Sequence, residues 1–199
     1  MVMFTLLAAA SLTTGQQNPV LSKGGLIVGG QPDAPIRMEV FSCYQCPPCR
    51  EFYLETIRPL LKEYARENKV CVIYYEFPLK IHNYSRDTAR YAVAAYRLGQ
   101  DQWQRVSEAL YEKQFQWASD GKIEAVVAAV LTPEEMAKVK QFLKDPSIDQ
   151  IIDRDIAIGY KRKIPGTPTF FLYAKGREEK VVGGVSYPVL KDYLSQLLK

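Results

Sequence analysis

Histidine, tryptophan and cysteine are all scarce in this chain. Its 199 residues include one histidine, two tryptophans and four cysteines. Four cysteines are too few for a disulfide scaffold of this length, so we expect a hydrophobic core to hold the fold together. Beyond the N-terminus there is no apolar run of about 18 residues or more, and we therefore expect no membrane-spanning segment in the mature protein.

An excess of charge of one sign is also missing. The 26 basic and 22 acidic residues leave a net charge of +4, and the longest basic run is Lys161-Arg162-Lys163. This balance predicts no nucleic-acid partner. Internal repeats and low-complexity tracts are absent, and the 47% hydrophobic and 24% charged residues are typical of a globular protein. The length suits one core with a sizeable helical excursion.

The first 35 residues are interpreted as a lead that contains a signal remnant, a polar segment and a short strand. Residues 2–12 are apolar, and Ala8 and Ala10 have the spacing of a secretory cleavage site. No basic residue precedes them, which is consistent with a truncated or misassigned start. A short helix packed on the body is the alternative. The signal reading predicts an extracytoplasmic protein, either periplasmic, secreted or membrane-associated.

Beyond the lead, strands and helices alternate around a long helical block. We expect strands at 36–41, 70–77, 169–174 and 180–184, and helices at 47–67, 85–98, 101–115, from 133 onward, 146–160 and 187–198. Strands before and after a run of helices predict an α/β body with an inserted all-helical domain. The predicted parts are the lead at 1–35, the body at 36–80 and 161–199, and the insertion at 81–160.

Three of the four cysteines lie close together, at the junction of the strand at 36–41 and the helix that follows. Cys46-Pro47-Pro48-Cys49 places Cys46 at the helix N-cap, where unpaired N–H groups and the positive end of the helix dipole favour a thiolate. A thiolate is the nucleophile of disulfide exchange. Pro47 suits the first helical position, because its missing N–H is not needed there. We therefore predict a redox pair.

The other two cysteines have different environments. Cys71 begins a strand parallel to 36–41, which separates it from Cys43 by roughly 15–20 Å, beyond disulfide reach. We expect Cys71 to be a free, buried thiol. Cys43 precedes Cys46 by three residues. It is either a bystander or an extra redox thiol that forms a disulfide with Cys46.

Metal or iron-sulfur binding is an alternative from another functional class. Cys43, Cys46 and Cys49 repeat the opening spacing of a bacterial ferredoxin motif. That motif needs a fourth cysteine, and Tyr53 occupies its place. We therefore expect no metal site, and colour in the visible range or metal by elemental analysis would reverse this expectation.

Several motifs together resemble the DsbA-type branch of the thioredoxin superfamily. They are Pro32-Asp33-Ala34-Pro35, Phe41-Ser42, Gln45-Cys46-Pro47-x-Cys49, Phe77-Pro78-Leu79 with His82, and Gly166-Thr167-Pro168-Thr169-Phe170-Phe171. The resemblance implies a thioredoxin-like fold, a mixed sheet flanked by helices, with a helical insertion. It implies that Cys46 is the exposed attacking cysteine and Cys49 the buried resolving one. Pro168 would be a cis-proline beside them, and Thr167, Pro47 and Pro48 would contact an extended substrate.

The sequence also departs from this family's pattern. Relatives usually carry a buried acid six positions before the attacking cysteine, where this chain has Val40, and Glu39 should point to the opposite face of the sheet. Glu76 is a candidate for the missing proton relay, or else a plain strand-end acid. Pro48 replaces the histidine of strong oxidants, which predicts a Cys46 pKa below about 8.5 but above about 3.5. His82 is expected to cap a loop near the insertion.

The resemblance implies a dithiol oxidase, with a disulfide reductase or isomerase of the same fold as the alternative. Only about 35 residues precede the first core strand, too few for the dimerisation domain of such isomerases, so we expect a monomer. The expected partners are reduced or unfolded proteins and a membrane redox partner, either a quinone-linked reoxidase or a thiol donor. No cofactor is expected, because the cysteines carry the electrons.

Overall fold

The computed structural model describes residues 24–199, and the predicted signal remnant at 2–12 lies outside them. Within this part of the chain, no helix is both long and apolar enough to cross a membrane. The elements, in chain order, are β1 (Leu26–Gly29), β2 (Ile36–Ser42), α1 (Pro47–Phe52), η1 (Tyr53–Ile57), α2 (Arg58–Leu60), η2 (Leu61–Ala65), β3 (Val70–Glu76), α3 (Ser85–Tyr96), α4 (Gln100–Glu112), α5 (Gln114–Asp120), α6 (Ile123–Ala128), α7 (Pro133–Phe142), α8 (Ser147–Lys161), β4 (Thr169–Ala174), β5 (Arg177–Val182) and α9 (Tyr187–Leu197).

One mixed sheet in the order β1-β3-β2-β4-β5 forms the centre of the molecule. β2 and β3 are parallel, in a register that runs from Ile36 opposite Val70 to Ser42 opposite Glu76. The other neighbouring pairs are antiparallel. All seven residues of β3 are buried, which explains why this strand reads as an apolar run without alternation. β1 lies in the lead, where a short strand was expected.

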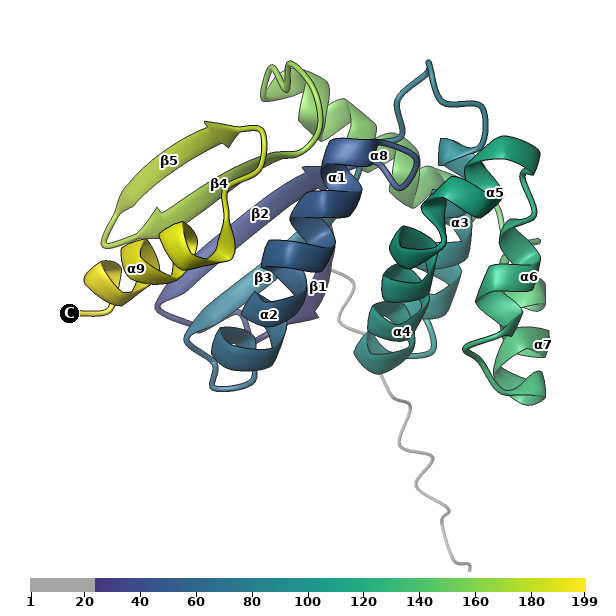
Figure 1. Ribbon diagram of the computed structural model, residues 1–199, viewed down its shortest axis with the longest axis horizontal. Coiled ribbons are helices and arrows are strands. Elements are labelled where there is room, and N and C mark those ends of the chain that lie inside the picture. Colours follow the sequence, from purple (N-terminus) through teal and green to yellow (C-terminus); the bar gives the residue numbers. More distant parts are fainter. Residues whose placement is uncertain (1–23) are drawn as a thin grey trace, which may run out of the picture.

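The two faces of the sheet carry separate cores (Figure 1). Val40 and Tyr74 point toward the face covered by α1, α2, α4 and α9. Phe41 and Tyr75 point the other way, where Ile156 and Ile158 of α8 pack against them. Because alternate residues of a strand face opposite sides, β2 contributes to both cores. The turn after β2 consequently connects a strand that is fixed on both faces to the start of α1.

The helix predicted at 47–67 is one continuous helical run, but its backbone widens twice, at η1 and η2. Pro59 lies between these two π-helical segments. A proline inside a helix removes a backbone hydrogen bond, and its ring crowds the carbonyl four residues earlier. A widened turn accommodates both effects without ending the helix.

Helices α3 to α8 lie between β3 and β4, as the sequence predicts for an insertion. The single helix expected at 101–115 is wrong, because Lys113 leaves the helical backbone region and separates α4 from α5. α6 was not predicted at all. The capping box at Thr132 is confirmed, since the Glu135 N–H bonds the Thr132 hydroxyl and the Glu135 carboxylate bonds the Thr132 N–H.

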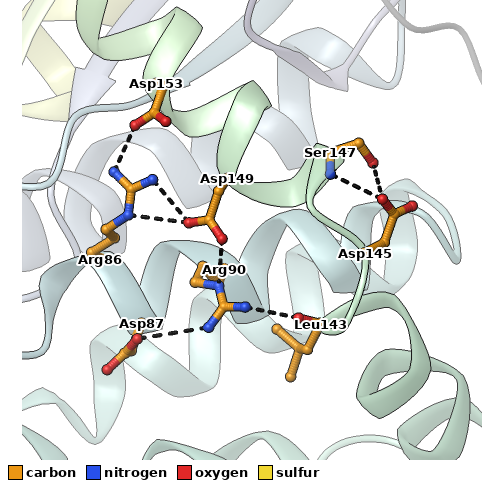
Figure 2. A network of polar contacts seen from close by, with 8 residues as sticks. All are labelled: Arg86, Asp87, Arg90, Leu143, Asp145, Ser147, Asp149 and Asp153. Carbon is orange, nitrogen blue, oxygen red and sulfur yellow. Dashed lines mark hydrogen bonds and ion pairs between the residues drawn. The ribbon is translucent and has the colours of Figure 1, made fainter.

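Ion pairs connect α3 to the start of α8, and a hydrogen bond connects it to the end of α7 (Figure 2). Arg86 contacts Asp149 at 2.9 Å and Asp153 at 2.8 Å. Arg90 contacts Asp149 at 3.3 Å and also donates a 2.7 Å hydrogen bond to the carbonyl of Leu143. The network joins the first helix of the insertion to the helix that returns the chain to the sheet.

The strand predicted at 180–184 is shifted, since β5 runs from Arg177 to Val182. Gly183 has a φ of 89°, a left-handed conformation that ends the strand. Lys175 and Gly176 form the two-residue turn before it, with φ values of 50° and 72°. Four of the six residues of β5 are charged and the strand is mostly exposed, so it has no apolar pattern for the sequence analysis to detect.

Candidate active site

Cys46 is the N-cap of α1, and Pro47 occupies the first turn, as the sequence predicts. The Cys46 backbone is extended, with φ −85° and ψ 120°. The N–H groups of Cys49 and Arg50 both bond the Cys46 carbonyl at 3.1 Å. These bonds close the first helical turn directly behind the Cys46 sulfur, so the two cysteines share one turn.

The second part of the site comes from the loop before β4. The Thr167-Pro168 peptide bond is cis. The Cys46 thiol donates a 3.4 Å hydrogen bond to the Thr167 carbonyl, although 121 residues separate them. The Thr167 hydroxyl is buried and bonds no protein nitrogen or oxygen, but it lowers the pKa of both Cys46 and Cys49. This loop therefore lies against the redox pair.

Accessibility and acidity differ between the two cysteines. Cys46 is 5% exposed and Cys49 is 0% exposed, so Cys46 is the more accessible of the two. Cys46 is nevertheless far less exposed than the resemblance implies, because the Thr167 carbonyl contacts its sulfur. Hydrogen bonding from Cys49, supported by Thr167 and by the charge of His82, lowers the pKa of Cys46 to about 6. Burial and the neighbouring Cys46 raise the pKa of Cys49 well above its usual range. At neutral pH Cys46 is the thiolate and Cys49 the thiol.

The expected range for the Cys46 pKa is therefore confirmed, and His82 is a contributor that the sequence analysis did not assign. His82 Nδ1 lies 3.3 Å from the Cys43 sulfur. Its own N–H bonds the Leu79 carbonyl, and its carbonyl accepts from Ser85, so it also stabilises the loop as expected. His82 thus influences the pKa of Cys46 from the loop after β3, outside the redox motif.

Cys43 and Cys71 are both free thiols. Cys71 lies opposite Arg37 in the β2–β3 register, in the core on the far face of the sheet. The prediction that it is a free, buried thiol out of reach of Cys43 is confirmed. Burial raises the pKa of Cys43 to about 11, so this thiol is a weak nucleophile at neutral pH.

Gln114 and Tyr111 of the insertion both contact the segment that carries the cysteines, and the sequence predicted neither contact. The buried amide of Gln114 donates to the carbonyls of Tyr44 at 2.6 Å and Cys46 at 3.1 Å. Arg50 donates from Nε to the Tyr111 carbonyl at 3.0 Å. A glutamine with no local partner in the sequence carries no signal of this role, because its partners lie 68 and 70 residues away.

Val40 occupies the position where the resemblance implies a buried acid, and it is fully buried in the core beneath α1. Glu39 points to the opposite face, as expected. There it pairs with Arg37 at 3.1 Å and with Arg162, and it accepts a 3.1 Å hydrogen bond from Tyr173. Glu39 is thus occupied by ion pairing on the face of the sheet opposite to the redox pair, where its charge acts on Cys71 instead.

Glu76, the candidate proton relay, is buried and its Oε1 has no partner. Burial, followed by the negative charge of Asp155, raises its pKa well above the usual range. Asp155 itself accepts hydrogen bonds from the N–H groups of Gly25 at 3.0 Å and Glu76 at 3.1 Å. The charge of Glu76 acts on Tyr44 and Tyr74, while the largest influences on Cys49 are burial, Cys46, Ser42 and Thr167.

Among residues 24–199, no three histidine, cysteine, aspartate or glutamate side chains lie together as a metal site requires. Cys43 is engaged with His82, and Cys46 with Thr167. The three clustered cysteines therefore do not converge on one point.

Comparisons with known proteins bear on this site. A thioredoxin family model matches residues 22–182. The probable disulfide bond formation protein D of Bacillus cereus is 24% identical over 147 residues, which cover 72% of this chain and 68% of that protein. The protein of the same name from Bacillus anthracis is also 24% identical, over 72% of this chain and 67% of its own length.

Solved structures are similar over most of the chain. Alpha-DsbA1 from Wolbachia pipientis has a TM-score of 0.70 at 22% identity, over 89% of this chain and 92% of its own. Oxidised BdbD from Bacillus subtilis has a TM-score of 0.68 at 18% identity, over 88% and 98%. At these identities the structures establish the fold, and they confirm the predicted class of a mixed sheet with a helical insertion.

Proposed function

Because the chain belongs to the thioredoxin family, we propose that it is a DsbA-type thiol-disulfide oxidoreductase that works outside the cytoplasm as a dithiol oxidase. The proposal depends on one observation: the pKa values of the neighbouring Cys46 and Cys49 thiols are shifted in opposite directions. That of Cys46 is lowered to about 6, and that of Cys49 is raised. A good leaving thiolate beside a buried thiol suits a protein that passes its disulfide to others.

In the proposed reaction, a substrate thiolate attacks Cys46 of the oxidised pair. A bond forms between the substrate sulfur and the Cys46 sulfur, the Cys46–Cys49 bond breaks, and its electron pair passes to Cys49. A second substrate thiolate then attacks the first substrate sulfur and releases Cys46 as a thiolate. The substrate dithiol has lost two electrons and two protons, and the cysteine pair has gained the electrons. The cysteines need no bound cofactor for this exchange.

We assign substrate contact to the loop before β4 and to the exposed prolines of the redox motif. The Thr167 carbonyl lies 3.4 Å from the Cys46 sulfur, and Pro168 follows it through a cis bond, so an extended polypeptide that reaches this sulfur would meet their backbone. Pro47 and Pro48 are exposed at the start of α1. Pro168 cannot donate a backbone hydrogen bond, which leaves Thr167 to set the register of the bound segment.

Two further residues keep proposed roles of different kinds. We assign Glu76 to the proton relay, since burial raises the pKa of its carboxyl well above the usual range and its Oε1 has no hydrogen-bond partner. We assign Cys43 to holding His82 rather than to exchange. The same chemistry requires reduced or unfolded protein substrates and a membrane redox partner that restores the disulfide. A monomer suffices for these steps.

The reduction potential of the Cys46–Cys49 pair tests the direction of transfer. Equilibration of the full chain with glutathione buffers should give a value nearer to about −120 mV than to about −270 mV, the potentials of a strong oxidase and a reductase. A potential close to the lower figure would replace the oxidase by a reductase. A reductase would need a thiol donor in place of a reoxidase.

Cysteine variants test the roles within the pair. Cys46→Ser should abolish oxidation of a reduced client protein, because the attacked sulfur is gone. Cys49→Ser should accumulate a mixed disulfide with the client, visible by mass spectrometry. Cys71→Ser, which removes a buried thiol on the far face of the sheet, is the matched control and should retain activity. Activity that survives Cys46→Ser would refute the mechanism.

A further inference from the structure

Beneath Cys49, three hydroxyl groups from two strands and a helix form a continuous row of hydrogen bonds. Ser42 Oγ lies 3.0 Å from the Tyr111 hydroxyl, which in turn bonds the Tyr74 hydroxyl. At the other end, Ser42 is the last residue of β2, four residues before Cys46, and its side chain lowers the pKa of Cys49 through hydrogen bonding. We call Ser42, Tyr111 and Tyr74 the hydroxyl row, and Ser42 is its member next to the redox motif.

The row is sealed from solvent. Ser42 is 2% exposed, Tyr74 is 1% exposed and Tyr111 is 0% exposed. Tyr44 and Tyr53 stack on Tyr111, with ring centroids 4.8 and 4.7 Å from it, and hold its ring in place. Each hydroxyl has a single hydrogen to donate. If Tyr74 donates to Tyr111 and Tyr111 to Ser42, the Ser42 hydrogen is free to point at the sulfur.

The need for such a donor rests on the proposed function. Attack on Cys46 expels Cys49 as an anion in a buried place where an unsolvated charge is costly. Burial raises the pKa of Cys49, and Val40 on β2 is apolar and fully buried. The side chains that lower the Cys49 pKa are two hydroxyls, those of Ser42 and Thr167. The charge of Cys49 also acts on Tyr111 and Tyr74, which shows that the row lies within its field.

We propose that Ser42 is a catalytic residue that donates a hydrogen bond to the leaving Cys49 thiolate, with Tyr111 and Tyr74 as positioning residues that orient and polarise it. A hydrogen bond to an anion is stronger than one to a neutral disulfide sulfur. The donor therefore stabilises the transition state more than the ground state, which is the condition for catalysis. Hydrogen bonds in a chain strengthen one another, so the tyrosines act through Ser42.

The test is the rate at which dithiothreitol reduces the oxidised full-length protein, measured by acid quench, alkylation and mass spectrometry. This probe needs no protein client. Ser42→Ala should slow the reaction on the order of 10- to 100-fold, because a bond to a charged group is lost. Tyr111→Phe should slow it about two- to fivefold through lost polarisation. Tyr111→Phe should have almost no effect in the Ser42→Ala background, since the tyrosine acts through the serine.

Tyr44→Phe is the matched control. Tyr44 is equally buried and stacks on the same ring, but its hydroxyl bonds Ser107 at 2.7 Å instead of the row. This variant should react like the unmodified protein. The reduction potential should stay unchanged in Ser42→Ala, because forward and reverse rates fall together when only the transition state is affected.

Two results would overturn the inference. One is a Ser42→Ala rate within twofold of the unmodified protein, and the other is an equal effect of Tyr111→Phe with and without Ser42. A Ser42→Ala protein that does not fold leaves Tyr111→Phe against Tyr44→Phe to decide. Failure of the unmodified protein to form a Cys46–Cys49 disulfide at all would refute the proposed function, a result distinct from either of these.

Discussion

Cys46 owes its lowered pKa to neighbours from three separate parts of the chain. Cys49 is one helical turn away, Thr167 belongs to the loop before β4, and His82 belongs to the loop after β3. Cys49 hydrogen bonding is the largest of these influences, and the charge of His82 is the smallest. The prolines between the cysteines supply no charge, so this site replaces an inter-cysteine histidine by one brought in through tertiary structure.

His82→Gln should therefore raise the Cys46 pKa above about 6, because the variant removes a positive charge but keeps a polar side chain. The pH dependence of iodoacetamide alkylation of the reduced protein gives this pKa directly. Asn83→Ala, a change at an exposed residue of the same loop, is the control. An unchanged alkylation profile in His82→Gln would show that the imidazole has no influence on the thiolate.

The residues of the site differ in how well sequence predicts them. Cys46, Pro47 and Cys49 are local, since a strand, a turn and a helix start within a dozen residues define their roles. The cis bond before Pro168 and the contact of Thr167 with Cys46 agree with the resemblance but have no local pattern in the sequence. Ser42, Tyr111 and Gln114 could not be predicted, because their partners are 68 to 70 residues distant and a buried hydroxyl has no sequence signature.

Among the elements, α8 depends on contacts with both the insertion and the sheet. Its first turns bind α3 through Asp149 and Asp153, and its later turns bind the sheet through Asp155. The two arginines of α3 contribute differently. The Arg86 side chain is 42% exposed and contacts carboxylates only, whereas Arg90 is 31% exposed and also bonds a backbone carbonyl at the end of α7.

Arg90→Ala should lower the free energy of unfolding by about 1–2 kcal/mol, because it leaves the Leu143 carbonyl without its partner. Arg86→Ala should cost about 0.5 kcal/mol, and less in high salt, as exposed ion pairs do. Urea unfolding at low and high ionic strength separates the two. Equal losses in both variants would show that Arg90 contributes only through its charge.

Element boundaries were predicted well where a cap marks them and poorly where tertiary contacts set them. The proline at the start of α1 and the capping box of α7 are local signals. The break at Lys113 and the start of β5 have no such signal, because both lie in polar sequence. The parallel pairing of β2 and β3 followed from the order of strands and helices, and its register agrees with the predicted separation of Cys43 and Cys71.

At the scale of the whole molecule, the state of one sulfur affects the stability of the entire fold. The Cys46 pKa is about 6 in the folded protein and about 8.5 in an unfolded chain. A depressed pKa stabilises the folded state above the unfolded value, and the stabilisation is lost as pH falls through the folded value. Only the reduced protein has this titrating thiol, so the effect appears as a difference between redox states.

Linkage between these two pKa values sets an upper limit of about 2 kcal/mol on the stabilisation gained between pH 6 and 8. After allowance for partial solvent screening, the unfolding free energy of the reduced protein minus that of the oxidised protein should therefore rise by roughly 1 kcal/mol. Above about pH 8.5 the raised pKa of Cys49 acts in the opposite direction. Urea unfolding of both forms at pH 5.5, 7 and 8 measures the difference. A difference in unfolding free energy that does not change with pH would contradict this prediction. As a control, the reduced Cys46→Ser variant should show no such rise in unfolding free energy with pH.

The amide of Gln114 has a consequence for how this protein can change over time. Replacement or shortening of the segment between β3 and β4 should affect the active site, because the Gln114 side chain of this segment hydrogen-bonds the backbone of Tyr44 and Cys46. A chimaera with another protein's helices in this place would keep Cys46 and Cys49 but lose the hydrogen bonds from Gln114 to the turn before α1. Lineages of this chain are thus expected to exchange the two parts together or not at all.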